Sequence, residues 1–126
     1  MRVEREYNAA GKIIKQSHFD KADNLTPFDG SVARIEKTYD SQGRQLTEAY
    51  YGKDGKPTVD KNNIVRWRDE FDRQKKSRKR ILYSLPGYGV WGYKNVMRVE
   101  REYNAAGKII KQSYFDKAGK AITTVR

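Results

Sequence analysis

The chain has 126 residues, of which 37% are hydrophobic, 34% are charged and 12% are aromatic, and its formal net charge is +11. This length fits one domain, and the modest apolar content excludes a thick hydrophobic core. No cysteine is present and His18 is the single histidine, so we expect no disulfide, no metal cluster and no cofactor; no segment stays apolar over the roughly 18 residues that a transmembrane helix needs.

One segment occurs twice, because residues 1–17 and 97–113 both read MRVEREYNAAGKIIKQS. The offset of 96 residues equals three steps of 32, and similar residues recur at that step. The clearest series is aromatic: Tyr7, Tyr39, Phe71 and Tyr103. A period of this length is typical of repeat architectures. We therefore predict one repeat domain, whose four units are residues 1–31, 32–63, 64–95 and 96–126.

The first unit begins with the duplicated segment, for which a helix is the alternative to strands. Glu, Arg, Ala and Lys are good helix formers. However, the apolar residues of this segment form no sustained stripe with helical spacing, and residues 8–11 align with an evident turn at residues 40–43. We therefore predict two strands joined by a turn.

The second unit shows the expected hairpin most clearly. Residues 32–39 alternate between apolar and polar, which is the pattern of a half-buried strand. In the turn that follows, Asp40 is suited to bond the backbone and Gly43 to adopt a positive φ, as in a type I turn with a bulge. Residues 44–51 form the second strand, and residues 52–56 form another turn. The predicted fold class is all-β, with tandem β-hairpin repeats in an antiparallel meander or repeat array.

Acidic residues recur at one strand position, at Glu4, Glu36 and Glu100, next to recurring arginines. Ion pairing across strands explains this pattern better than acid–base catalysis does. No phosphate-binding loop, nucleophile elbow or dinucleotide motif is present. We therefore expect a protein without enzymatic activity.

The third unit departs from the others through its charge. The four units sum to 0, +1, +6 and +4, and residues 73–80 carry six positive charges. We expect this basic finger to project into solvent or to lie on a partner, where it would bind a polyanion. The alternative is an edge strand whose lysines block aggregation. The predicted polyanion-binding residues are Arg73, Lys75, Lys76, Arg78, Lys79 and Arg80.

The same unit also replaces its second turn by a glycine-rich aromatic loop. Small residues around the rings leave ring faces open to a sugar or a base. The alternative is a local aromatic core that stabilises a thin sheet, and Trp67 at a strand position is expected to belong to the core. The predicted aromatic ligand contacts are Tyr83, Tyr88, Trp91 and Tyr93.

Two kinds of known repeat resemble these units. Residues 39–44 and 103–110, which read YDSQGR and YNAAGKII, resemble the YD-type repeats of bacterial RHS proteins. Residues 51–56 and 115–120 resemble MORN-like hairpins and the turns of cell-wall-binding repeats. The resemblance implies a bacterial array at the cell surface or secreted, without catalytic residues in its repeats.

These observations predict a non-catalytic binding or scaffold module. The expected ligand is an anionic glycan or a cell-wall polymer. The alternatives are a nucleic-acid-binding module that uses the same basic hairpin, and an accessory repeat sheet of a larger surface glycosyltransferase or toxin shell. Because the first and fourth units are alike, we also expect an end-to-end or swapped homo-oligomer.

Overall fold

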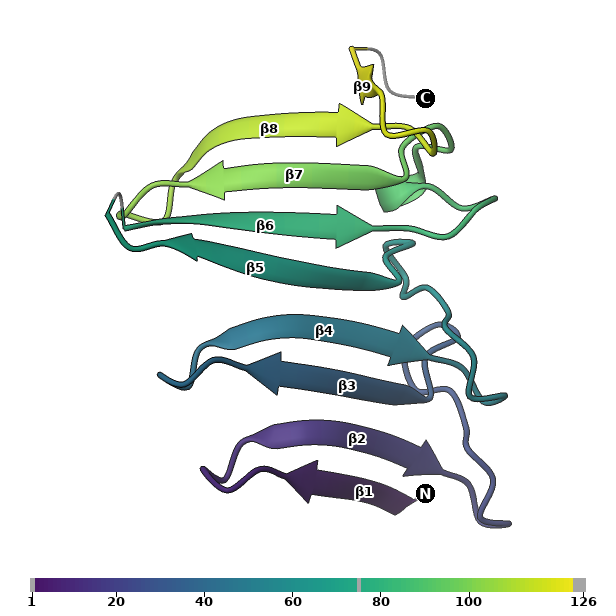
Figure 1. The fold of residues 1–126 in the computed structure, drawn as a ribbon. Helices are drawn as coiled ribbons and strands as arrows, with labels where there is room; N and C mark the ends of the chain where they lie inside the picture. The colour runs from purple at the N-terminus through teal and green to yellow at the C-terminus, as the bar shows by residue number, and fades with distance from the viewer. Residues whose placement is uncertain (1, 75, 124–126) are drawn as a thin grey trace. The chain divides into compact units, whose positions relative to one another are not determined.

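The computed structural model describes residues 2–74 and 76–123, and these form an all-β protein (Figure 1). Its strands are β1 (Arg2–Tyr7), β2 (Ile13–Phe19), β3 (Arg34–Tyr39), β4 (Gln45–Tyr51), β5 (Arg66–Asp72), β6 (Ser77–Tyr83), β7 (Arg98–Tyr103), β8 (Ile109–Phe115) and β9 (Ala121–Ile122). The helical content of the described residues is one 3-10 turn, η1 (Val90–Gly92), and it is too short to cross a membrane. The predicted tandem hairpins are confirmed, and the helical alternative for residues 1–17 is wrong.

The chain divides into two compact units, residues 1–61 with β1 to β4 and residues 62–126 with β5 to β9. Within each unit, strands that follow one another in the sequence pair as an antiparallel meander. Each compact unit therefore holds two of the four sequence repeats. That all four repeats form a single domain stays a prediction.

The turn between β3 and β4 has the predicted geometry. Asp40 accepts hydrogen bonds from the backbone N–H groups of Gln42 and Arg44, both at 2.9 Å. Gly43 has a φ of 83°, and the strand register shifts by one residue next to the turn. Although desolvation favours the neutral form, the hydrogen bonds from Arg44 and Gln42 lower the pKa of the Asp40 carboxyl. The predicted turn with a bulge is confirmed.

The turn between β5 and β6 is built differently. Here Lys76 takes the positive φ, at 53°, and pairing continues to Asp72 and Ser77 without a register shift. Lys75, which replaces the turn glycine in the sequence, lies outside the described residues. The third hairpin has therefore lost the bulge that the other three share.

A cation–aromatic pair recurs at the base of every hairpin. In the second repeat the guanidinium of Arg34 lies 4.6 Å from the ring centre of Tyr51, its direct partner across the strands. The equivalent pairs are Arg2 with Phe19 at 4.7 Å, Arg66 with Tyr83 at 3.7 Å, and Arg98 with Phe115 at 4.1 Å. Such a contact contributes about 0.5–1 kcal/mol at an exposed site. The 32-residue period of the sequence therefore corresponds to a repeated arginine–aromatic contact in the structure.

The core lies at the base of the hairpins and is thin, as the composition predicts. Buried apolar pairs immediately precede two of the first strands: Val32 and Ala33 before β3, and Ile64 and Val65 before β5. In the second compact unit, Val90 of the aromatic loop is fully buried. The aromatic loop therefore contributes a side chain to the core, and this contact fixes the loop backbone beside the sheet.

Candidate functional site

Strand β6 carries three of the predicted polyanion-binding residues, and it lies inside the second compact unit. It pairs with β5 on one side and with β7 on the other. The expectation that this part of the finger projects into solvent is therefore wrong, and so is the alternative that it protects an open edge. The positive charges fit inside the sheet because β5 and β7 supply a carboxylate and aromatic rings.

Arg80 is the most constrained of these cations. Its Nε and NH2 groups donate to the two carboxylate oxygens of Asp69, at 2.8 and 2.9 Å. Its guanidinium also lies 3.9 Å from the ring centre of Trp67. Asp69 is 7% exposed, so this ion pair is largely shielded from water. A bidentate pair of this kind fixes the plane of the guanidinium.

The pair of Asp69 and Arg80 inverts the arrangement of the other repeats. In the first repeat the cation stands on the first strand, where Arg5 Nε donates to Gln16 Oε1 at 3.1 Å. In the fourth repeat, Arg101 donates in the same way to its cross-strand partner at 2.6 Å. The third repeat has the acid on the first strand and the arginine on the second, so a second arginine comes to face Arg101.

Three arginines consequently gather on one face of β6 and β7. The register places Arg80 directly opposite Arg101, and Arg78 opposite Tyr103. Directly opposite residues of antiparallel strands share a face. The Arg78 guanidinium lies 4.3 Å from the Tyr103 ring, and the Arg101 guanidinium lies 4.4 Å from the ring of Trp91. We call this surface the arginine–aromatic face; its members are Arg78, Arg80, Arg101, Trp67, Trp91 and Tyr103.

The arginine–aromatic face combines partial exposure with positive charge. The side chains of Arg78 and Arg80 are 35% and 30% exposed. Asp69 interacts with both of them, since its Oδ2 is also 4.0 Å from Arg78. With three guanidinium groups and one carboxylate, the face keeps an excess of positive charge. Each guanidinium lies over a ring. Planar guanidinium groups recognise the oxygens of carboxylate, sulfate or phosphate groups.

Lys79 belongs to the other face of the sheet. Its Nζ lies 3.3 Å from Glu100, whose carboxylate also pairs with Arg98 at 3.0 Å. The recurring glutamates therefore form ion pairs, as expected, although Arg98 and Glu100 pair along one strand and not across strands. Lys79 is a predicted site residue that the structure separates from Arg78 and Arg80.

The remaining predicted residues lie at opposite ends of the third hairpin. Arg73 and Lys76 are exposed in its tip turn. Tyr88 and Tyr93 are 46% and 38% exposed in the loop beyond its base. Strand β6 has seven residues and separates the two ends by roughly 23 Å. Arg73 and Lys76 at the tip therefore lie apart from Tyr88 and Tyr93 at the base, and these four residues do not belong to one site.

The aromatic loop is a folded element. The N–H of Val90 donates to Val96 O at 2.8 Å, and that of Trp91 donates to Asn62 O at 2.9 Å. Trp91 adopts a φ of 57°, which turns its ring toward Arg101. Val90 and Val96 are fully buried. The loop core is therefore aliphatic, and the expected aromatic core is not what stabilises it.

Tyr83 is fully engaged within the protein. Arg66 covers its ring, and its hydroxyl accepts a hydrogen bond from Arg68 Nε at 3.0 Å. This hydrogen bond raises the pKa of the Arg68 guanidinium. Tyr83 therefore acts as a partner for two arginines on the face opposite to the arginine–aromatic face.

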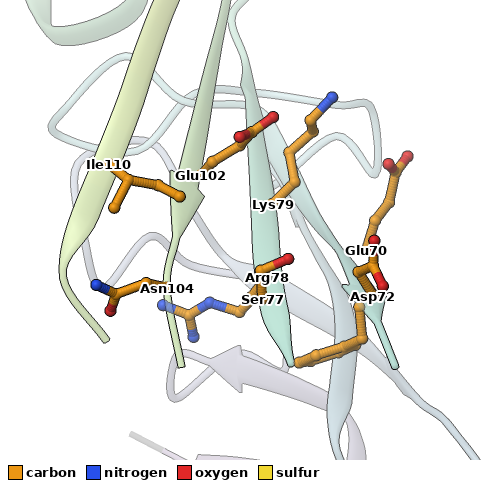
Figure 2. A pocket seen from close by; sticks show the side chains of 9 residues that line it. Glu70, Asp72, Ser77, Arg78, Lys79, Glu102, Asn104 and Ile110 are labelled. Carbon is orange, nitrogen blue, oxygen red and sulfur yellow. The ribbon is translucent and has the colours of Figure 1, made fainter. Parts of the chain in front are cut away.

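A hollow of about 470 Å³ lies near the tips of the third and fourth hairpins, between β5, β6 and β7 (Figure 2). Its lining includes three carboxylates, from Glu70, Asp72 and Glu102, against two cations. Figure 2 shows the side chain of Lys79 extending to one side of β6 and that of Arg78 to the other. Because acids outnumber cations there, this hollow does not favour a polyanion.

The described residues show no cluster of three or more side chains suited to a metal ion. His18 stacks on Phe28 at 3.7 Å, and its Nε2 lies 3.0 Å from Gln16 Nε2. Desolvation, followed by the charge of Arg5, lowers the pKa of the His18 imidazole. His18 therefore belongs to a side-chain stack, and its burial there disfavours the charged imidazolium.

Sequence reasoning missed half of the arginine–aromatic face, namely Trp67 as a surface ring, Arg101 and Tyr103. A signal was present, because aligning the repeats at 32 residues sets Asp69 and Arg80 against Arg5 and Gln16. In this exchange the arginine moves from the first strand of the hairpin to the second, and its partner stays directly opposite. Interpreted in this way, the exchange would have placed Arg80 inside the sheet and beside Arg101.

The fold and this surface define a class: a tandem β-hairpin repeat protein with an arginine-rich, ring-lined face. Comparison of the chain with protein-family models, with curated proteins and with solved structures gave no match. The geometry and charge of the described residues therefore supply the evidence for function.

Proposed function

We propose that this protein is a non-catalytic β-repeat binding module whose arginine–aromatic face contacts an anionic polymer, such as a bacterial surface glycan or a cell-wall polymer. The observation that carries the proposal is the set of three half-buried guanidinium groups, each held against a ring, with one carboxylate among them. Stacking reduces the rotamer entropy that an arginine loses on binding, so such groups are prepared for anionic oxygens.

The distribution of charge supports the same proposal. Residues 62–126 contain 16 Lys and Arg against 6 Asp and Glu, whereas residues 1–61 contain 11 against 10. The positive field therefore belongs to the compact unit that carries the arginine–aromatic face. A field of this kind attracts a polyanion and raises its association rate at low salt.

An anionic glycan suits this face better than a nucleic acid because each of its three rings already has a guanidinium over one side. The resemblance of residues 39–44 and 103–110 to YD-type repeats also favours a bacterial surface polymer. A nucleic acid is the second candidate, and the exposed rings of Tyr88 and Tyr93 favour it. Each base stacked on an aromatic ring contributes about 1–3 kcal/mol.

Binding of heparin, poly(glycerol phosphate) and single-stranded DNA, each at low and at physiological salt, tests the proposal. Replacing Arg101 by Gln should weaken binding of the anionic polymers by at least about tenfold, since one charged hydrogen bond contributes about 1.5–3 kcal/mol. Arg5→Gln is the matched control, because it removes the same charge from the identical sequence segment. Gln16 stands opposite Arg5 as Gln112 stands opposite Arg101, but Arg80 on β6 faces Arg101.

The control should change affinity by less than about twofold, as expected for a charge outside the site. Equal losses for the two variants would mean that net charge alone binds the polymer, and would refute the arginine–aromatic face as a site. Preferential binding of DNA that is lost in the Tyr88→Ala variant would favour the second candidate.

A further inference from the structure

The duplicated segment occurs in two different surroundings. Residues 2–7 form β1, which is exposed along its whole length, whereas the identical residues 98–103 form the half-buried strand β7. The reverse holds for the second strand, because β2 is half-buried while the tip half of β8 is exposed. Since the compared strands differ only at His18 and Tyr114, the neighbouring strands produce the difference.

Four exposed apolar side chains lie on β1 and β8: Val3 (37% exposed), Tyr7 (56%), Ile109 (50%) and Ile110 (58%). The equivalents of the two isoleucines in the first compact unit are covered. Ile13 and Ile14 are half-buried there, and the Tyr39 hydroxyl donates a hydrogen bond to Ile13 O at 2.7 Å. Tyr39 is the 32-residue equivalent of Tyr7. The exposed residues of β8 and β1 therefore correspond to the two sides of the contact that β2 and β3 make within the first compact unit.

The pairing of β2 with β3 supplies the template for this contact. After β2 the chain turns back and makes one bridge, between Phe19 and Leu25. Strand β3 then pairs with the middle of β2: Lys15 with Glu36, Gln16 with Ile35, and Ser17 with Arg34. The base of β2 is thus occupied by the returning chain and its middle by the next hairpin.

Strand β8 repeats the first part of this template and lacks the second. The returning chain is β9, which pairs Ala121 with Phe115 and Ile122 with Tyr114. Among the described residues, no strand pairs with the outer edge of residues 111–113, which correspond to residues 15–17. This edge is therefore the unfilled position of a β3-like strand.

Strand β1 has the side chains that fit this position. Arg2, Val3 and Glu4 stand 32 residues before Arg34, Ile35 and Glu36. Within the part of the chain that the structure describes, β1 pairs with β2 and its other edge has no strand beside it. We propose that β1 of a second copy of this chain adds to β8, and that Lys111 then lies opposite Glu4, Gln112 opposite Val3 and Ser113 opposite Arg2. This register repeats the placement of Lys15 directly opposite Glu36.

The contact buries the exposed isoleucines of β8 under Val3 and Tyr7 of the second copy. It also lets the Tyr7 hydroxyl donate to Ile109 O, as Tyr39 donates to Ile13 O. The two surfaces differ, so each added copy presents a new open β8 edge. A contact of this heterologous kind generates chains of increasing length. Assembly therefore depends on protein concentration.

A second register exists in the protein and serves as the competitor. Between β6 and β7, Lys79 lies opposite Glu102 and Tyr83 opposite Arg98. Transferred to β8, this register sets Lys111 opposite Glu6 and Phe115 opposite Arg2. It conflicts with β9, which already pairs with Phe115. The structure therefore selects the register with Glu4.

Disulfide trapping tests the register directly, because the chain has no cysteine of its own. Opposite Cα atoms in an antiparallel pair lie roughly 4.5–5.5 Å apart, which a disulfide spans. A Lys111→Cys protein mixed with a Glu4→Cys protein should form a heterodimer under mild oxidation. The mixture with Glu6→Cys protein is the matched control and should give severalfold less. Equal trapping of the two mixtures, or none, would overturn the proposal.

Light scattering of the unmodified chain provides a second readout. The average mass should rise with concentration, and Gln112→Pro should abolish the rise. The backbone N–H of His18 in β2 donates to Ala33 O, on the side of β3. The N–H of Gln16, two residues earlier in the same strand, points to that side too. Gln112 is the equivalent of Gln16 in β8, so its backbone N–H points to the open edge. Proline there removes an outward backbone donor and no backbone donor within the hairpin. Gln112→Ala, which loses the same side-chain contacts with Arg101 and Tyr114, is the control and should keep the rise. A constant monomer mass, or a rise that Gln112→Pro leaves unchanged, would overturn the proposal.

Discussion

Replacing Asp69 by Asn removes the one carboxylate among the arginines of the arginine–aromatic face. The substitution keeps the shape of the side chain and leaves Arg80 without its counter-charge. Because Arg80 lies opposite Arg101, two guanidinium groups then face each other across β6 and β7. Like charges in directly opposite positions destabilise a sheet.

The structure sets the size of the expected effect. Removing one partner of a buried ion pair costs about 3–5 kcal/mol. The Asp69 side chain is 3% exposed but that of Arg80 is 30% exposed, so water screens part of the loss. We therefore expect the free energy of unfolding to fall by about 2–3 kcal/mol, which for a domain of this size lowers Tm by roughly 10–20 °C.

Urea unfolding followed by tryptophan fluorescence measures this change, since Trp67 stacks with Arg80. The Glu6→Gln variant is the control, because Glu6 is 63% exposed and pairs with Lys15 at 3.6 Å. Its loss should stay below about 0.5 kcal/mol. An Asp69→Asn protein as stable as the unmodified chain would refute the reasoning.

A compensated variant separates the ion pair from other effects of the substitution. Asp69→Arg combined with Arg80→Gln gives the third repeat the arrangement that Arg5 and Gln16 have in the first. We expect this double variant to recover stability to within about 1 kcal/mol of the unmodified chain, because separate losses at contacting residues do not add. A double variant less stable than Asp69→Asn would show that the two arrangements are not equivalent.

Two further predictions concern His18 and the aromatic loop. The pKa of His18 is lower in the folded chain than in the unfolded chain. As the pH falls below about 6.5, the unfolded chain therefore takes up a proton on His18 before the folded chain does, and this destabilises the folded state. Tm should fall with pH in that range and be independent of His18 above it. His18→Tyr, which copies the fourth repeat, should flatten this dependence in thermal unfolding; an identical slope would contradict it. Gly89→Ala should cost at least about 2 kcal/mol in urea unfolding, since Gly89 has a φ of 96° and an added Cβ would lie 2.0 Å from Tyr93 O. Gly87→Ala, with a φ of 90° and no atom within 4 Å of its Cβ, should cost about 1 kcal/mol, and equal losses would show that the clash is unimportant.

The strands and the common turns were predictable because their causes are local. Alternation within residues 34–39 defines two faces, and the spacing of Asp40 and Gly43 defines the turn. The chemistry of such a turn is complete within five residues. The third hairpin was harder to predict, because its glycine is replaced and Lys76 adopts the positive φ in its place.

The sequence predicted part of the site, but for a physical reason that the structure does not support. Arg78, Arg80 and Trp91 were selected as residues that reach outward, yet each has a partner within the second compact unit. Whether a charged strand projects depends on the strands that flank it. Asp69 is 11 residues from Arg80 and Arg101 is 21 residues away, so no local pattern around the finger reveals them.

The two copies of MRVEREYNAAGKIIKQS separate the contributions of sequence and tertiary structure. By itself the sequence determined that each copy forms two strands with a bulged turn, because backbone geometry and hydrogen bonding are satisfied within the hairpin. It did not determine which strand is covered. Tyr7 is 56% exposed while the identical Tyr103 lies under Arg78, and Ile109 is 50% exposed while Ile13 is half-buried. Burial is a property of pairs of surfaces, so only the tertiary structure decides where an identical segment contributes core and where it remains open to a partner.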